Sequence, residues 1–405
     1  MIILSNAAKN IRRYSRKSAL YVLICVIAVM TLQIYIASIE RTEKQLADLP
    51  AAMPVLARVA SLDGSSFAAL QIRPSMIDGL QISPHVRDLQ MSIALISKPT
   101  YFPCEYGPND LARVVAANST NAVEGLKQDG ITWLPGYNPE IMNGSDAVCI
   151  AGESNFMVRC DWSLGDIITL DLRKYKYDTR SVLFDEIGTM DVRIVGTTKA
   201  FTAGEFVMPF ETVWAFARDM NVELPASAAS FYVRDALQLN DFKAEMKKLY
   251  LGPAITNGSV WLATLQHSGV SLSVYDAAFI SAATQLQSAI LLLRGFLPLM
   301  VAVLAIIGYF VAYMMIQNRR EEYAVLRLIG MSRRAVVSMY FCEMAFLTLG
   351  GSFVGASITT ASGIGSATVG SEVFLLFSMC FILGSAIALF RISRTNVMLA
   401  LSRRD

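Results

Sequence analysis

Apolar residues gather in four long stretches of the chain, and charged residues are nearly absent from them. Residues 19–38, 295–316 and 373–390 carry no charge, and residues 335–359 carry only Glu343. A helix of about 20 apolar residues crosses the hydrocarbon core of a bilayer. The pattern therefore predicts four membrane-spanning helices, over 19–38, 294–316, 335–359 and 371–390. The alternative for any one of them is a helix buried in a protein core.

Five basic residues stand before the first apolar stretch, a pattern that secretory signal peptides share. The stretch is 20 residues long, whereas the apolar part of a signal peptide has about 7–15 residues. No clear small-x-small cleavage site follows it. We therefore expect an uncleaved membrane anchor.

Lysine and arginine are concentrated in three short segments next to the apolar stretches. Residues 1–18 carry five bases and no acid, a charge of +5, whereas 317–334 and 391–405 each carry +3. Residues 39–293 hold 20 bases and 28 acids, a charge of −8. Short basic segments remain in the cytoplasm under the positive-inside rule. Both termini and the 317–334 loop are therefore predicted to be cytoplasmic, with 39–293 and the short loop 360–370 outside.

The composition of the whole chain supports a membrane protein. Hydrophobic residues make up 54% and charged residues 17% of the 405 positions, against about 45–50% and about 25% in soluble domains. These values argue against a soluble enzyme and against a disordered chain. The net charge of +2 excludes a strongly basic nucleic-acid binder, so no nucleic-acid partner is expected.

Residues 39–293 show mixed patterns that predict an α+β domain with a helical stalk at each end. Residues 39–49 continue the first membrane helix, and 274–293 lead into the second. Branched and alternating segments predict strands over Leu56–Ala60, Val86–Ile93, Ile167–Leu172, Asp191–Val195 and Ser230–Val233. Helices are predicted over Pro74–Gly79, Asp110–Ala116, Pro209–Met220 and Leu237–Tyr250, and turns at Asp63-Gly64, Asn143-Gly144 and Asn257-Gly258.

The six cysteines divide equally between the predicted membrane helices and the predicted outer domain. Cys104, Cys149 and Cys160 lie in the outer domain, so at most one disulfide forms within the chain there. A Cys149–Cys160 bridge and three reduced thiols are the two alternatives. No C-x-x-C pair is present, and no metal site is expected.

Motifs for catalysis and for ATP binding are missing from the sequence. His85 and His267 are the only histidines, and neither lies in H-E-x-x-H; no serine lies in G-x-S-x-G. The chain contains no Gly-Lys dipeptide and therefore no phosphate-binding P-loop. We expect no catalytic, cofactor-binding or metal-ligating residues. Any ATP-driven work must then use the ATP of another chain.

Residues 317–334, between the second and third predicted membrane helices, carry the most informative local pattern. Arg319 to Ile329 favours a helix, with apolar residues at a spacing of three. Gly330 suits the C-terminal end of that helix, and Ser332 is predicted to cap the next one. These signals predict a short amphipathic helix on the cytoplasmic face. The alternative is an ordinary basic loop that satisfies the positive-inside rule.

The run from Arg319 to Gly330 resembles the signature loop of FtsX-like ABC-transporter permeases of the MacB/LolC type, the type VII permeases. The matching positions in and after the loop are Glu322, Leu326, Arg327, Gly330 and, in the following helix, Glu343. Tyr323 and Ala324 depart mildly from the pattern. Weaker similarity over Ala8–Arg13, Leu164–Leu170 and Val192–Gly196 extends the resemblance over nearly the whole chain.

The resemblance implies a MacB-like periplasmic core for 39–293 and a bacterial cell membrane as the location. It implies a dimer with a second permease subunit, identical or different, and two ATPase subunits on the cytoplasmic side. Such permeases work by mechanotransmission, in which ATP-driven closure inside moves the stalks and reshapes the outer domains. Relatives handle peptides, toxins, lipoproteins and lipids, and membrane lipids surround them.

On this resemblance, the short helix of the 317–334 loop is the coupling helix that docks on the ATPase. Arg320, Glu322 and Arg327 are then candidates for ion pairs with the ATPase. Leu326 and Ile329 are expected to fill its groove, and Gly330 to end the helix.

Two features of the third membrane helix predict how it packs. Glu343 lies about nine residues beyond Arg334, roughly 14 Å along a helix, so its carboxyl should face protein and not lipid. A structural hydrogen bond is one role for it, and gating or proton relay is another. Gly351 and Gly355 form a small-x-x-x-small face, which lets helices approach closely within one subunit or across a dimer.

Two other classes of protein share parts of this pattern. A membrane sensor or receptor would also carry an outer domain, although the longest inner segment here is only about 18 residues. An activator of a cell-wall hydrolase, as in the cell-division members of the same family, is the second alternative.

Overall fold

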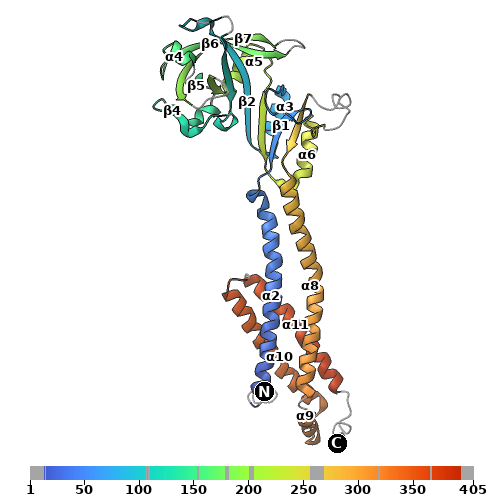
Figure 1. The fold of residues 1–405 in the computed structure, drawn as a ribbon. Coiled ribbons are helices and arrows are strands. Elements are labelled where there is room, and N and C mark those ends of the chain that lie inside the picture. The colour runs from blue at the N-terminus through green and yellow to red at the C-terminus, as the bar shows by residue number, and fades with distance from the viewer. Residues whose placement is uncertain are drawn as a thin grey trace. The chain divides into compact units, whose positions relative to one another are not determined.

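The computed structural model describes residues 13, 15–105, 107, 110–123, 125–152, 155–177, 182–199, 205–255, 269–317, 320–364 and 367–393. The chain divides into two compact units (Figure 1). The membrane unit comprises residues 1–49 and 281–405, and the sheet unit comprises residues 50–280. The motif at Ala8–Arg12, the turn at Asn257-Gly258 and residues 394–405 lie outside the described residues.

Four long apolar helices form most of the membrane unit. They are α2 (Ser15–Ala52), α8 (Ala277–Gln317), α10 (Arg333–Ala361) and α11 (Ala367–Ser393). Each is long and apolar enough to cross a membrane. The prediction of four membrane-spanning helices is confirmed.

Helices α2 and α8 both extend well beyond the predicted spans, as expected for stalks. The helical backbone of α2 runs unbroken to Ala52, and that of α8 begins at Ala277 and contains Pro298. The two helices are tied together within the membrane unit. The Tyr35 hydroxyl donates a hydrogen bond of 2.6 Å to the Leu293 carbonyl oxygen, and Glu43 Oε1 lies 2.7 Å from Arg294 Nη2.

Small residues let α10 lie directly against α2. A Cβ atom placed on Gly351 would come within 2.7 Å of Cys25 Cβ, and one on Gly355 within 3.0 Å of the Val26 carbonyl oxygen. Both distances are shorter than ordinary carbon contacts. The Gly351-x-x-x-Gly355 face therefore packs within one chain, which is one of the two arrangements that the sequence left open.

Hydroxyl and amide groups join the membrane helices in their interior. Such bonds are needed because lipid offers no partner for a buried polar group. They link Tyr21 Oη to Thr348 Oγ1 at 3.0 Å, Ser352 Oγ to Ser378 Oγ at 3.0 Å, and Thr359 Oγ1 to Gln33 Oε1. Helix α10 is thereby held to both α2 and α11.

The sheet unit is built on one mixed, strongly curved sheet of ten strands (Figure 1). The strand order is β10-β1-β9-β2-β3-β8-β5-β7-β4, and β6 pairs with both β2 and β7. The strands are β1 (Leu56–Ser61), β2 (Val86–Lys98), β3 (Ala112–Ala117), β4 (Ile131–Trp133), β5 (Val148–Gly152), β6 (Ile167–Tyr177), β7 (Val182–Thr198), β8 (Phe206–Pro209), β9 (Ala228–Val233) and β10 (Val270–Val274).

Short helices cover this sheet, which confirms the predicted α+β class. They are α3 (Pro74–Ile82), α4 (Asn155–Arg159), α5 (Phe210–Asp219) and α6 (Leu239–Lys248), with 3-10 turns at Pro99–Tyr101, Thr120–Ala122, Gln128–Gly130, Pro139–Asn143 and Ala236–Gln238. Phe206, Phe210, Phe231 and Phe242 are fully buried between the layers. Burying aromatic side chains of this size is the main gain in free energy available to such a domain.

The prediction of a helix over Asp110–Ala116 is wrong, because residues 112–117 form strand β3. Ala112–Ala117 pairs antiparallel with β2 and parallel with β8. In a short apolar run, periodicity does not separate a strand from a buried helix. Here the ladder partners on both sides decide the structure.

Four further strands, β4, β5, β8 and β10, are not predicted from the sequence, because two of them are fully buried and the other two are short. Every residue of β5 and of β8 is buried, so neither shows the alternation that marks a half-exposed strand. β4 has three residues, and β10 has five. β10 also takes the place predicted for the start of the second stalk, which begins at Ala277 and not at Val274.

The close approach of α10 and α2 makes a testable prediction. Leucine at Gly351 must push against Cys25 and the α2 backbone, and overpacking of this kind costs about 1–3 kcal/mol. We expect Gly351→Leu to lower the temperature at which the detergent-solubilised protein loses its monodisperse chromatography peak.

The adjacent residue provides a matched control for this variant. A Cβ on Gly350 meets nothing within 4 Å, so Gly350→Leu makes the same chemical change on the open face of α10. Equal losses in both variants would show that α10 does not lie against α2 in this way.

Candidate functional site

The loop between α8 and α10 contains helix α9 (Arg320–Leu328), which ends at a glycine. Gly330 has a φ of +96°, a left-handed conformation that glycine adopts without strain. Its N–H donates to the Arg327 carbonyl and the Met331 N–H donates to the Leu326 carbonyl, both at 3.2 Å. These two bonds form a Schellman motif, which stops a helix sharply.

Ser332 begins the next helix immediately after this stop. Its hydroxyl oxygen accepts a hydrogen bond of 3.3 Å from the Ala335 N–H. This is the N-cap interaction that satisfies a free N–H group of the first helical turn. Gly330 and Ser332 thus hold the positions that the sequence predicts for them, and Arg319 lies outside the described residues.

The apolar side chains of α9 divide into an inward and an outward group. Leu326 and Met331 pack against the core of the membrane unit. Val325, Leu328 and Ile329 are 51%, 73% and 75% exposed. Leu326 therefore packs inward against the membrane unit, and Leu328 joins Ile329 among the exposed residues. The i, i+3, i+4 spacing of the exposed residues was the sequence signal for this face.

Two charged residues of α9, Glu322 and Arg327, have partners within the chain. Glu322 Oε1 lies 3.9 Å from Arg13 Nη1 at the start of the first membrane helix. Arg327 Nη1 donates to the Met331 carbonyl oxygen at 3.3 Å, which reinforces the turn after α9. The side chain of Arg320 lies outside the described residues. The Glu322 pair is long and half-open to water, so it contributes little energy and is readily exchanged.

Glu343 lies inside the membrane unit and not on its lipid-facing side. Its side chain is 1% exposed, and the neighbouring Tyr340 and Met344 belong to the apolar core. A carboxyl in hydrocarbon is costly, and packing against protein reduces that cost.

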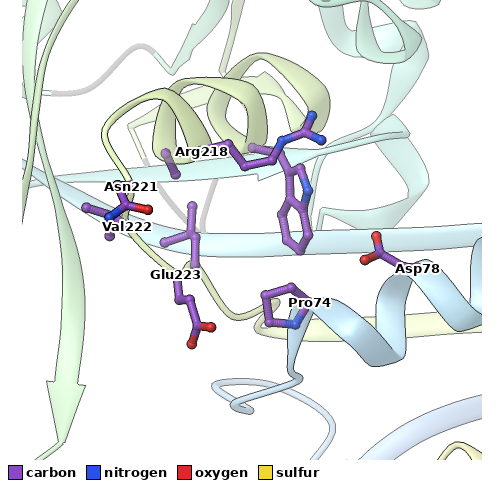
Figure 2. A pocket seen from close by; sticks show the side chains of 9 residues that line it. Pro74, Asp78, Arg218, Asn221, Val222 and Glu223 are labelled. Carbon is purple, nitrogen blue, oxygen red and sulfur yellow. The ribbon is translucent and has the colours of Figure 1, made fainter.

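The sheet unit contains a shallow hollow of about 240 Å³ between α3 and α5. Figure 2 shows the side chains of Asp78 and Arg218 projecting from these two helices toward the hollow. Trp214 and Glu223 contribute to its lining. The hollow carries both signs of charge on exposed side chains, and its chemistry does not select one class of ligand.

A disulfide joins Cys104 to Cys160, with Cα atoms 4.9 Å apart, across 56 residues of sequence. The expected alternatives, a Cys149–Cys160 bridge or three reduced thiols, are both wrong. Cys149 is the second residue of strand β5, is fully buried and carries a free thiol. Burial raises the pKa of the Cys149 thiol, which keeps it protonated and unreactive.

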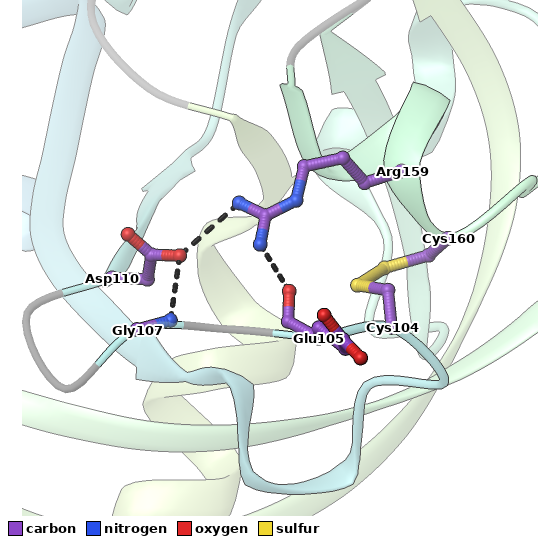
Figure 3. The surroundings of a disulfide bond; sticks show 6 residues. All are labelled: Cys104, Glu105, Gly107, Asp110, Arg159 and Cys160. Atoms are coloured by element: carbon purple, nitrogen blue, oxygen red, sulfur yellow. Dashed lines mark hydrogen bonds and ion pairs between the residues drawn. A yellow bond between two sulfur atoms is a disulfide. The ribbon is translucent and has the colours of Figure 1, made fainter.

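Arg159 reinforces this link on the residue next to Cys160. Figure 3 shows its guanidinium between Asp110 and Glu105. It donates to Asp110 Oδ2 at 3.1 Å and to the Glu105 carbonyl oxygen. Hydrogen bonds from the Gly107 N–H and from Arg159 lower the pKa of Asp110. The contribution of this carboxylate to stability is therefore present above its unfolded pKa and is lost as the pH falls through its folded pKa.

The remaining candidates for chemistry are the two histidines and any cluster of metal-binding side chains. His85 Nε2 lies 3.4 Å from Glu245 Oε2, a pairing between a loop and helix α6. Among the residues that the structure describes, no three His, Cys, Asp or Glu side chains gather to hold a metal ion. His267 lies outside the described residues.

Comparison with protein families identifies the C-terminal part of the chain. A model described as FtsX-like permease C-terminal matches residues 295–397, which include α9, α10 and α11. The stretch contains the exposed face of α9, the Schellman stop and Glu343. Residues 295–397 are accordingly similar to the C-terminal part of FtsX-like permeases. No curated protein matches the chain.

Solved structures similar to part of the chain include domains of MacB, of YknZ and of a permease protein. The periplasmic region of MacB from Actinobacillus actinomycetemcomitans is 11% identical, covers 56% of this chain and 91% of its own, and has a TM-score of 0.31. The extracellular domain of the ABC-type transporter YknZ from Gram-positive bacteria is 12% identical, covers 54% and 99%, and has a TM-score of 0.30.

A third structure, a domain of a permease protein from Porphyromonas gingivalis, is 13% identical, covers 55% of this chain and 86% of its own, and has a TM-score of 0.27. The α+β class of the sheet unit rests on its own strands and helices.

The cysteine arrangement makes a testable prediction. After mild reduction of the folded protein, a membrane-impermeant maleimide should label Cys104 and Cys160 but leave Cys149 unlabelled, because Cys149 is buried and protonated. Peptide mass spectrometry checks the position of each label. Without reduction, none of the three should react, and after unfolding and reduction all three should. Labelling of native Cys149 would contradict the disulfide assignment.

Proposed function

We propose that this chain is the permease subunit of an ABC transporter that converts ATP hydrolysis by a separate ATPase chain into movement of the sheet unit. The observation that carries the proposal is the outer face of α9. Val325, Leu328 and Ile329 expose apolar surface on a short helix that is fixed between two membrane helices. Large apolar side chains this exposed are typical of a surface that binds a protein partner.

The way α9 is anchored supports a mechanical role. The Schellman stop at Gly330 leaves no flexible linker before α10. On its inner side, Leu326 packs against the core of the membrane unit. A push on the exposed face of α9 would therefore move α10 and not merely bend a loop.

Close packing within the membrane unit continues from α10 to α2. Helix α10 lies against α2 at two glycines, and α2 continues without a break to Ala52. Movement at the α9 end would thus reach the stalk through close-packed backbone, which deforms less than layers of flexible side chains. This continuity supports mechanotransmission, in which substrate need not pass between the membrane helices.

The partners and location follow from the same proposal. The basic segments support a location of α9 and both termini in the cytoplasm of a bacterial cell, with the sheet unit outside the cell membrane. Two copies of the permease, identical or related, would bind two ATPase subunits, which would hold the ATP. The substrate would be a peptide, a lipoprotein or a lipid-like molecule.

The docking role of α9 is tested by removing its exposed apolar surface. In the double variant Leu328→Ser with Ile329→Ser, we expect the ATPase subunit to be lost when the permease is purified from its native membranes. Removing two such side chains from a docking surface costs about 2–4 kcal/mol, or roughly 30- to 1,000-fold in affinity. Quantitative mass spectrometry of the co-purified ATPase measures the loss.

A matched control uses an equally exposed apolar residue of the sheet unit. Val158 is 79% exposed, and Val158→Ser should leave ATPase binding unchanged. Full retention of the ATPase by the double variant would refute docking through α9. Purification of the wild-type chain with no ATPase at all would favour a sensor or a hydrolase activator.

A further inference from the structure

A second hollow in the sheet unit, of about 320 Å³, lies on one face of strands β1, β9 and β2. Register places Arg58 opposite Ser230, and Ser230 opposite Gln90. Partners in an antiparallel ladder project from the same face. Three adjacent strands thus present one row of polar side chains, with a single guanidinium at its end.

The guanidinium of Arg58 is held in place by an aromatic ring. Its central carbon lies 4.4 Å from the centre of the Phe67 ring, and both residues line the hollow. Stacking of this kind restrains the flexible arginine side chain and leaves its N–H edge available. Within the described part of the chain, no carboxylate forms an ion pair with Arg58.

The remaining polar side chains of the hollow have unused hydrogen-bonding capacity. Gln90, Ser92, Asn121 and Ser230 line it, and the described residues offer none of these side chains a hydrogen bond. Ser92 is only 9% exposed, which places a hydroxyl at the bottom of the hollow. Amide and hydroxyl groups in this position are arranged to bind a polar ligand.

The charge of the hollow is opposite to that of its surroundings. Residues 39–293 hold 20 bases and 28 acids, a net charge of −8, yet none of the described residues that line this hollow is an aspartate or glutamate. A guanidinium in such a place attracts an anion, because no carboxylate of this described lining competes for it. The other hollow, between α3 and α5, contains Asp78 and Glu223 and lacks this property.

We propose that this hollow binds a carboxylate carried on a small, hydrogen-bonding body. The planar guanidinium fork of Arg58 matches the two oxygens of a carboxylate. The amides of Gln90 and Asn121 would pair with peptide-like groups beside it. The volume lies at the lower end of the range for small-molecule sites, about 300–1,000 Å³. The proposal concerns binding alone and holds whether or not the chain works with an ATPase.

The source of the carboxylate is either the C-terminus of a peptide or a free organic acid. The probes are N-acetyl-Ala-Ala with a free carboxylate, the same peptide as its C-terminal amide, and glutarate. Each is titrated calorimetrically into the full chain in lipid nanodiscs. The carboxylate peptide should bind about tenfold or more tightly than the amide, because only the carboxylate forms both bonds to Arg58.

The test of the residue itself is Arg58→Gln, which should weaken binding of the carboxylate peptide about tenfold or more. Arg58→Lys keeps the charge but lacks the fork, and it should restore only part of the affinity. Arg218→Gln, in the other hollow, makes the same change and should leave affinity unaltered. Thermal melting of each variant confirms that it is folded.

The outcomes distinguish the two sources of the carboxylate and show whether the proposal is wrong. Preference for the peptide over glutarate identifies a peptide C-terminus, and equal or tighter binding of glutarate identifies a free organic acid. The proposal is overturned by equal binding of carboxylate and amide, by full affinity in folded Arg58→Gln, or by tighter binding of inorganic phosphate than of either carboxylate.

Discussion

The absence of water in a bilayer is the constraint on which the membrane unit depends. A helix satisfies its own backbone there, but each polar side chain must find a partner within the protein. This explains why the hydroxyls and amides of α2, α10 and α11 bond to one another, and why glycines bring α10 and α2 close enough for them to do so. The same requirement places Glu343 inside the helix packing. What would be isolated polar residues in lipid instead hold the helices in one arrangement.

Features that depend on local chemistry were predictable from the sequence. The membrane helices follow from a window of about 20 residues, and the stop at Gly330 follows from the single residue type that tolerates its backbone angle. Features set by distant partners were not predictable. The short run that forms strand β3 predicts a helix, because its pairing with β2 and β8 is not visible in the local sequence. Cys160 pairs with Cys104 and not with Cys149, which is nearer to it in sequence, because the fold buries Cys149 within β5.

The two candidate binding surfaces, on α9 and in the sheet unit, also differ in how far the sequence alone predicts them. On α9, sequence spacing located the helix and its apolar residues, but packing against the membrane unit decided that Leu326 faces inward while Leu328 faces outward. In the sheet unit, Arg58, Ser230 and Gln90 are far apart in sequence, and only strand register brings them into one row. A surface on a single helix can be found from sequence alone, whereas one assembled across strands requires the fold.

The contacts between α2 and α8 restrict how the stalks can move. Tyr35 bonds to the Leu293 carbonyl and Glu43 pairs with Arg294, just before Pro298. Proline has no N–H to donate to the carbonyl oxygen four residues earlier in a helix. Helix α8 therefore lacks the backbone hydrogen bond to the Arg294 carbonyl and is most easily bent there. Helix α2 therefore contacts and supports α8 at the point where α8 bends most easily. Sliding by one helical turn, about 5.4 Å, would break both contacts, whereas both are kept when the two helices tilt or travel together as a pair.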